Sequence, residues 1–171
     1  KGNPVAMGLS RQRLGEGAKR GDLTGRNPTD RGKLGVKRHL MTDSRGVPLS
    51  VLLTGANVHD KWMVGQVLDA VPLSREGVPI RPENLCLDKG YDYADTEYEV
   101  WLRGVTPHIR RRGEPPLLGV FNGKARRWVV ERTNSWHNRF RALLIRWERK
   151  ASNHLALVHL ACGLIAFQQA E

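Results

Sequence analysis

The sequence predicts an α/β fold in which a mixed β-sheet is flanked by helices. Apolar periodicity gives the order strands, helix, strand, helix, strand and then two helices, which is typical of a mixed sheet with helices packed against it. The chain has 171 residues, of which 40% are hydrophobic, and this length is enough for one domain with a proper core. Acidic residues at the strand ends of such a sheet can therefore meet in space although they lie far apart in the sequence.

The N-terminal elements are predicted from turn residues. Eight glycines and scattered Arg and Lys in the first 35 residues predict loop, apart from a short strand at 4–9. Two strands follow at 37–43 and 47–54, and the Ser-Arg-Gly between them predicts a hairpin turn.

The middle of the chain alternates helix and strand. In order, its predicted elements are a helix at 57–71, a loop at 72–82 with three prolines, a strand at 85–88, a helix at 94–104 and a strand at 105–109. The first helix places Met63, Val67, Leu68 and Val71 on one face, and Gly104 closes the second helix.

Two helices are predicted after a basic loop. The first spans 128–149, and its core stripe comprises Val129, Thr133, Trp136, Phe140, Leu143 and Trp147. Off this stripe, Arg132, Arg139 and Arg146 recur every seven residues on a roughly common face. The last helix, at 153–168, is apolar almost all round, which predicts that it is buried.

The charge of the chain is strongly positive. Twenty-eight Lys and Arg against 17 Asp and Glu give a net charge of +11 and a pI near 10.4. Such an excess attracts polyanions, because each phosphate that Lys or Arg neutralises releases counterions. Charge and arginine clustering together favour nucleic acid over the alternative of a basic protein with a solvated surface.

Cysteine usage and hydropathy indicate the compartment. Cys86 and Cys162 lie in apolar runs and are interpreted as small buried hydrophobic residues in a reducing compartment. The longest apolar stretch, 155–167, is shorter than the ~20 residues that cross a bilayer. The sequence therefore predicts no membrane span and no signal peptide.

Two acidic residues stand out. In "ENLCLDKGYD" a short apolar run ends on Asp88 and turns at once, so Asp88 could hold an oxygen ligand rigidly beside a glycine turn. The alternative is a turn-capping aspartate bonded to the following amides. Glu131 lies near the start of a cationic helix, where the alternative role is an ion pair with a neighbouring arginine that stabilises the helix N-terminus.

Four stretches resemble bacterial insertion-sequence transposases with a DDE catalytic domain, of the IS five-like group. They are "GRNPTDRGKLGVKRHLMTDSRGVPLSVLLTGANVHD", "LCLDKGYDY", "HIRRRGE" and "RRWVVERTNSWHNRFRALLIRWE", and they cover most of residues 25–167. The resemblance implies a ribonuclease-H-like fold and Mg2+-dependent (or Mn2+-dependent) DNA cleavage and strand transfer. It also implies that Asp88 and Glu131 are catalytic metal ligands and that Arg127 accompanies them, while Asn138 stands where relatives often carry a lysine.

Carboxylates suit this chemistry. Hydrolysis of a phosphodiester and its joining to a 3'-hydroxyl are both in-line displacements, in which two divalent ions roughly 3.5–4 Å apart can bind the attacking and the leaving oxygens. Mg2+ takes hard oxygen ligands, so three acidic residues are a workable minimum. Asp88 and Glu131 are expected to bind Mg2+ or Mn2+ jointly.

The first aspartate of the resemblance is missing. Relatives tend to read Met-Asp-Gly on the first strand, but here Met7 is followed directly by Gly8, so the first strand is expected to be incomplete. A small deletion or a damaged reading frame would explain this, and residues 1–24 are interpreted as a basic remnant of a truncated chain, before a catalytic domain at 25–171. Substitute ligands would have to come from Asp22, Asp30 or Asp43. Because catalytic residues act as a unit, the chain alone is predicted to be weak or inactive.

The resemblance and the charge together predict DNA contacts. The predicted DNA-binding residues are Arg110, Arg111, Arg112, Arg132, Asn138, Arg139 and Arg146. The alternative for the basic loop is a solvated charge run, but its place between the two carboxylate-bearing segments favours phosphate contact. The expected partners are transposon ends and target DNA, with a homodimer on DNA implied, in the bacterial cytoplasm near the nucleoid.

Two other functions remain open from the sequence. The first is a DNA-binding module without catalysis, whose salt-sensitive binding would survive the loss of both carboxylates. The second is a stand-alone ribonuclease-H-like nuclease, which would cut the RNA of a hybrid preferentially.

Overall fold

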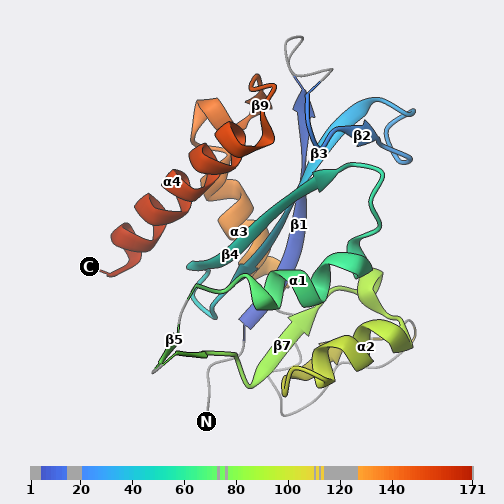
Figure 1. Ribbon diagram of the computed structural model, residues 1–171, viewed down its shortest axis with the longest axis vertical. Helices are drawn as coiled ribbons and strands as arrows, with labels where there is room; N and C mark the ends of the chain where they lie inside the picture. The colour runs from blue at the N-terminus through green and yellow to red at the C-terminus, as the bar shows by residue number, and fades with distance from the viewer. Residues whose placement is uncertain are drawn as a thin grey trace.

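The centre of the fold is a mixed sheet, described here from a computed structural model of the chain (Figure 1). The structure describes residues 5–14, 21–72, 74–75, 77–109, 111, 113 and 127–170. Strand β1 (Val5–Leu14) is antiparallel to β3 (Leu34–Thr42) on one side and parallel to β7 (Asn84–Leu87) on the other. Strand β4 (Pro48–Gly55) pairs antiparallel with β3, and β8 (Thr106–Ile109) pairs parallel with β7. The order β4-β3-β1-β7-β8 is ribonuclease-H-like and confirms the predicted fold class.

Four short strands complete the sheets. β2 (Gly25–Arg26) pairs with the start of β3, and β9 (Ile145–Arg146) pairs with the end of β1. β5 (Ser74–Arg75) and β6 (Val78–Pro79) form a separate hairpin inside the segment that was predicted as a loop.

Helices cover both faces of the central sheet (Figure 1). One face carries the short 3-10 helix η2 (Asp60–Met63), α1 (Val64–Asp69) and α2 (Ala94–Trp101), and the other carries α3 (Arg127–His137) and α4 (Ala151–Ala170). Alternation along β1 assigns its side chains to the two cores. Val5 and Met7 join the core of α1 and α2, whereas Ala6 joins the core of α3 and α4.

The first strand is longer than predicted, and the expectation that it would be incomplete is wrong. The expected strand ended at residue 9, but β1 continues to Leu14, and its partners in β3 run from Thr42 to Gly35. Pairing with β3 holds polar residues such as Ser10 and Gln12 in the strand. The sequence has no apolar run here that would have predicted a strand. A segment assigned to an N-terminal remnant therefore forms the central strand of the sheet.

The helix predicted at 128–149 is wrong beyond His137. α3 ends there, the 3-10 helix η5 (Arg141–Leu143) follows, and β9 then pairs with β1. Phe140 has an extended backbone (φ −82°, ψ 104°), so the chain turns away from the helix axis. Arg132, Arg139 and Arg146 consequently do not share one helix face.

The last helix is buried on one face only. Val158, Ala161 and Ile165 of α4 are buried, whereas Leu160, Leu164 and Phe167 are exposed, so the prediction of an all-round buried helix is wrong. With 20 residues and a mean hydropathy of 1.2, α4 is long and apolar enough to cross a membrane. The apolar stretch at 155–167, from which no membrane span was predicted, covers only part of this helix. In the structure its buried face packs against the sheet.

Several local predictions are confirmed. Asp43 Oδ1 accepts hydrogen bonds from the N–H groups of Arg45 and Val47, both at 2.8 Å, which fixes the β3–β4 turn. Gly46 has φ +88°, a left-handed conformation that favours glycine. Gly104, with φ +70°, follows α2 as expected.

Candidate active site

The site is centred on the edge of β1 that faces β7. β1 pairs with β7 through Val5 and Ala6 and with β9 only at its far end, so the stretch from 7 to 12 lies between these pairings. Ala6 pairs with Cys86 in parallel register. Two residues further along each strand, Gly8 and Asp88 are therefore level with each other.

Asp88 lies on the α3 side of the sheet. Leu85 and Leu87 of β7 pack into the core of α1 and α2, while Cys86 packs against the core of α3 and α4. Asp88 has an extended backbone (φ −73°, ψ 161°), which continues the alternation, and is half-buried on the same side as Cys86. Its Oδ1 accepts a hydrogen bond from the Lys89 N–H at 2.6 Å at the start of η3 (Lys89–Tyr91). Asp88 therefore caps the turn that follows it, which was the alternative role considered for this residue.

Glu131 lies on the exposed side of α3. Val130, the residue before it, packs against Gly8 of β1, and Arg132, the residue after it, donates a hydrogen bond to the Arg45 carbonyl in the β3–β4 turn. At 100° per residue, the Glu131 side chain is turned by the same angle from each of these neighbours. Glu131 is thus exposed on the helix that covers the same face of the sheet as Cys86, and its position beside Asp88 stays a prediction.

Among the residues that the structure describes, this edge of the sheet carries no third carboxylate. A Cβ built at Gly8 would lie 2.8 Å from Val130 Cγ1 and 3.3 Å from Val130 Cβ, so position 8 faces α3 and its space is filled. Met7 faces the opposite core. Across the described part of the chain, no three His, Cys, Asp or Glu side chains are grouped to hold a metal ion. The family's two-ion chemistry needs about three carboxylates, so the residues present do not fit it.

The three substitute aspartates have other partners. Asp43 fixes the hairpin turn, and Asp30 pairs with Lys33 at 3.6 Å. Asp22 lies beside the segment after β9, where its N–H donates to the Arg149 carbonyl at 3.0 Å. None of these contacts directs a carboxylate toward Asp88.

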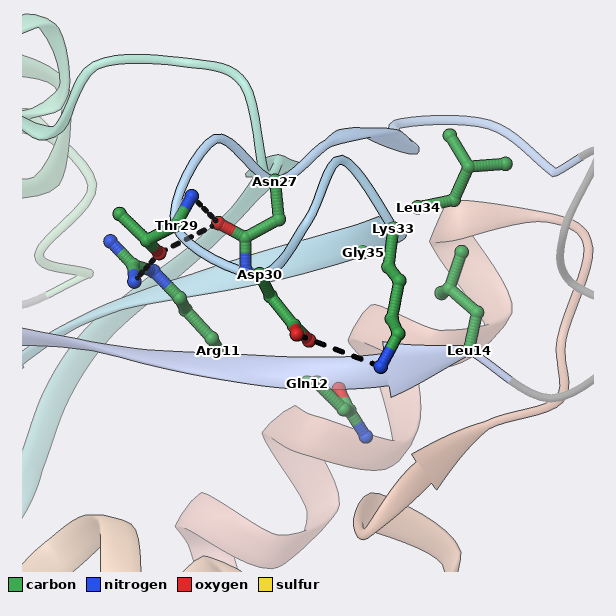
Figure 2. Close-up of a pocket in the computed structure, with 9 residues that line it drawn as sticks. All are labelled: Arg11, Gln12, Leu14, Asn27, Thr29, Asp30, Lys33, Leu34 and Gly35. Carbon is green, nitrogen blue, oxygen red and sulfur yellow. Dashed lines mark hydrogen bonds and ion pairs between the residues drawn. The ribbon is translucent and has the colours of Figure 1, made fainter.

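Asp30 lines a polar pocket of about 660 Å3 (Figure 2). The pocket lies between the end of β1 and the loop before β3, and its lining residues are Arg11, Gln12, Leu14, Asn27, Thr29, Asp30, Lys33, Leu34 and Gly35. Asn27 Oδ1 accepts from both the N–H and the hydroxyl of Thr29, and Arg11 donates to the same hydroxyl oxygen. These bonds fix the shape of the loop at 27–32 ("NPTDRG"), which belongs to the first of the stretches that resemble transposases.

The basic loop is described only in part. Arg110, Arg112 and the side chain of Arg127 lie outside the described residues. Arg111 is exposed and pairs with Glu97 at 3.3 Å and with Asp92 at 3.8 Å. Its predicted contact with DNA stays a prediction.

Arg132 and Arg139 differ in their surroundings. The Arg132 guanidinium lies 4.8 Å from the ring centroid of Trp128 and 5.0 Å from that of Trp136. Trp136 is half-buried rather than fully in the core. Arg139 is exposed and lines a pocket of about 310 Å3 beside α4, so its charge can reach a phosphate.

Arg146 is fully buried. Its guanidinium donates to the carbonyl oxygens of Glu148 at 2.8 Å, Asp22 at 2.8 Å and Arg149 at 2.9 Å. A DNA contact from Arg146 would require these bonds to break. Its neighbour Trp147, predicted as core, is 58% exposed.

A buried polar cluster around Arg38 was missed in the sequence. Arg38 of β3 is 1% exposed, donates to Ser10 Oγ at 3.1 Å and to Asn138 Oδ1 at 3.4 Å, and burial lowers its pKa to about 10. Beside it, the His137 ring contacts Cys162 Sγ at 3.3 Å, and burial raises the pKa of the Cys162 thiol to about 12. The sequence signal that could have revealed this cluster is the charged pair Lys37 and Arg38 inside a predicted strand. Asn138, a predicted phosphate ligand, is thus bonded to a buried arginine.

The strand order β4-β3-β1-β7-β8 defines a ribonuclease-H-like domain, and the sequence assigns this domain to the DDE-type transposases. The chain belongs to the transposase DDE domain family, whose model matches residues 9–165. It is 44% identical over 147 residues to a Burkholderia cepacia protein named as a transposase for the insertion sequence element IS402. That alignment covers 84% of this chain and 68% of the relative.

A solved structure is also similar. It is the piggyBac transposase in a synaptic complex with hairpin DNA, with a TM-score of 0.49 and 11% sequence identity. The match covers 96% of this chain, which spans 46% of the piggyBac chain.

Proposed function

We propose that the chain is a DDE transposase catalytic domain that acts on the ends of an insertion sequence and is impaired by the loss of its first aspartate. The observation that supports this is Gly8, which lies level with Asp88 and faces α3 but has no side chain. In this proposal Asp88 and Glu131 are the retained catalytic carboxylates, and Arg127 accompanies them. Assignment to the IS five-like group belongs to the same proposal.

The loss of one carboxylate has a large effect in such a site. The residues of a catalytic constellation act as a unit, so removing one member removes most of the rate enhancement. We therefore expect DNA cleavage and strand transfer by this chain to be several orders of magnitude slower than with three carboxylates.

DNA is the partner that the charge supports. The chain carries +11, and Arg111 and Arg139 present guanidinium groups on the surface. We propose that they contact the phosphate backbone of transposon ends and target DNA, which positions the duplex without reading sequence. A dimer on DNA in the bacterial cytoplasm is part of the proposal.

The test is an Mg2+-dependent cleavage assay on insertion-sequence-end DNA with the unchanged chain and with Gly8→Asp. We expect background cleavage from the unchanged chain. Strong cleavage by it would contradict the proposed impairment.

A second candidate function is DNA binding without catalysis. Two observations favour this candidate: the described part of the chain has no cluster of three acidic or other metal-binding side chains, and the net charge is strongly positive. It predicts salt-sensitive DNA binding that Asp88→Ala and Glu131→Ala leave unchanged. Binding that does not weaken with salt would count against this candidate.

A further inference from the structure

An exposed aromatic and cationic surface lies next to the turn that follows Asp88. Trp62 is 62% exposed and Tyr93 is 42% exposed, although both are large aromatic residues. Trp62 belongs to η2, and Tyr93 precedes α2 directly. η2 contacts η3, the turn that Asp88 begins, so this surface adjoins the carboxyl end of β7.

Lys61 joins the two rings. Its Nζ lies 4.5 Å from the ring centroid of Trp62 and 4.6 Å from that of Tyr93. Its position is fixed by an ion pair with Asp95 at 2.7 Å, and the His59 ring meets Tyr93 edge-on at 5.5 Å. We call Lys61, Trp62 and Tyr93 the ring platform.

The Asp95 pair decides which force dominates on the ring platform. Because Asp95 already offsets much of the Lys61 charge, a phosphate would gain little from this lysine. Lys61 covers one face of each ring. A base can stack only on the exposed remainder of Trp62 and Tyr93, and such stacking is worth about 1–3 kcal/mol per base. The ring platform is therefore better suited to a base than to a duplex backbone.

We propose that the ring platform stacks an unpaired nucleotide of DNA. Inside a duplex both faces of each base are covered by neighbouring bases, so an aromatic side chain can stack only on a base that has left the helix, lies in a single strand or ends the duplex. The net charge of +11 brings the polyanion to the chain. This inference rests on the proposed function, because it assigns a single-stranded region of the DNA substrate to a surface beside Asp88.

The test measures the affinity of fluorescently labelled oligo(dT) and of a duplex of equal length at one fixed salt concentration. Trp62→Ala and Tyr93→Ala should each weaken oligo(dT) binding about tenfold and change duplex binding less than about twofold. Trp62→Phe should retain most of the oligo(dT) affinity, since it keeps a π-face. Trp147→Ala is the matched control, because Trp147 is equally exposed (58%) but lies outside the ring platform.

Three outcomes would overturn the inference. Equal effects of Trp62→Ala and Trp147→Ala would show that the ring platform has no special role. Equal losses on oligo(dT) and duplex would show a backbone contact instead of stacking. An unchanged chain that binds neither probe would contradict the proposed function as well, whereas the first two outcomes leave DNA binding intact and contradict this inference alone.

Discussion

Val130 of α3 occupies the space that a side chain at Gly8 of β1 would need, with its Cγ1 2.8 Å from the position of a Cβ there. This contact brings α3 against the central strand at the level of Asp88. It also means that a carboxylate at position 8 requires Val130 to shift.

Arg146 is predicted to act in folding. Arg146→Ala removes a donor from three carbonyl oxygens and should lower the free energy of unfolding by about 3 kcal/mol. Arg139→Ala is the surface control and should change it by less than about 0.5 kcal/mol. Urea denaturation measures both, and equal effects would contradict the structural role of Arg146.

Arg139 is predicted to contact DNA. Because its guanidinium is exposed, Arg139→Ala should weaken binding to all sequences about equally and reduce the slope of log affinity against log salt by about one. Filter binding or anisotropy over a salt series measures this slope. An unchanged slope would remove Arg139 from the interface.

Buried Lys37 and half-buried Asp60 are predicted to be strongly coupled. Lys37 is 4% exposed, and its Nζ donates to Asp60 Oδ1 at 2.7 Å and to the Val58 carbonyl at 2.6 Å. Asp60→Ala leaves a buried ammonium without its carboxylate and should cost about 3–5 kcal/mol of unfolding free energy. Lys37→Met/Asp60→Ala should cost less than Asp60→Ala alone, and strict additivity in urea denaturation would contradict the coupling.

Acid is predicted to destabilise the fold through His137. Burial, and then the positive charge of Arg38, lower the pKa of His137 to about 4 from an ordinary value of 6.5. Between pH 6.5 and 4 the unfolded chain binds a proton that the folded chain does not. The stabilisation from neutral His137 is therefore complete above pH 6.5 and is lost as pH falls toward 4.

The measurement is the unfolding free energy as a function of pH. His137→Gln should flatten the slope between pH 6 and 4.5 by up to about 1.4 kcal/mol per pH unit. The exposed His159 is the control, and His159→Gln should leave the slope as it is. If both variants gave the slope of the unchanged chain, burial of His137 would not contribute to the pH dependence of the unfolding free energy.

Elements with local signals could be predicted from the sequence. The β3–β4 hairpin has Asp43 and Gly46 at its turn, α2 is followed by Gly104, and β7 is an apolar run that ends on Asp88. These residues determine structure through their own backbone or nearest neighbours. The aspartate at a strand end was identified from the same kind of signal.

Elements that depend on distant partners could not be predicted. The stretch after His137 has helical periodicity, but β9 pairs with β1 and the Arg146 guanidinium binds the distant Asp22 carbonyl, so tertiary contacts override propensity. The apolar α4 gives no sign of which face packs. The ring platform was also missed, because Lys61 and Tyr93 meet only when η2 contacts η3.

The central claim is that position 8 lacks the carboxylate that Asp88 and Glu131 require. The most direct measurement is Mg2+-dependent cleavage of insertion-sequence-end DNA by the unchanged chain, by Gly8→Asp/Val130→Ala, and by that double variant with Asp88→Asn added. We predict background cleavage from the first, a gain on the order of 100-fold or more from the second, and a return to background in the third. Cleavage by the unchanged chain at the rate of the double variant, or a gain that survives Asp88→Asn, would contradict the claim.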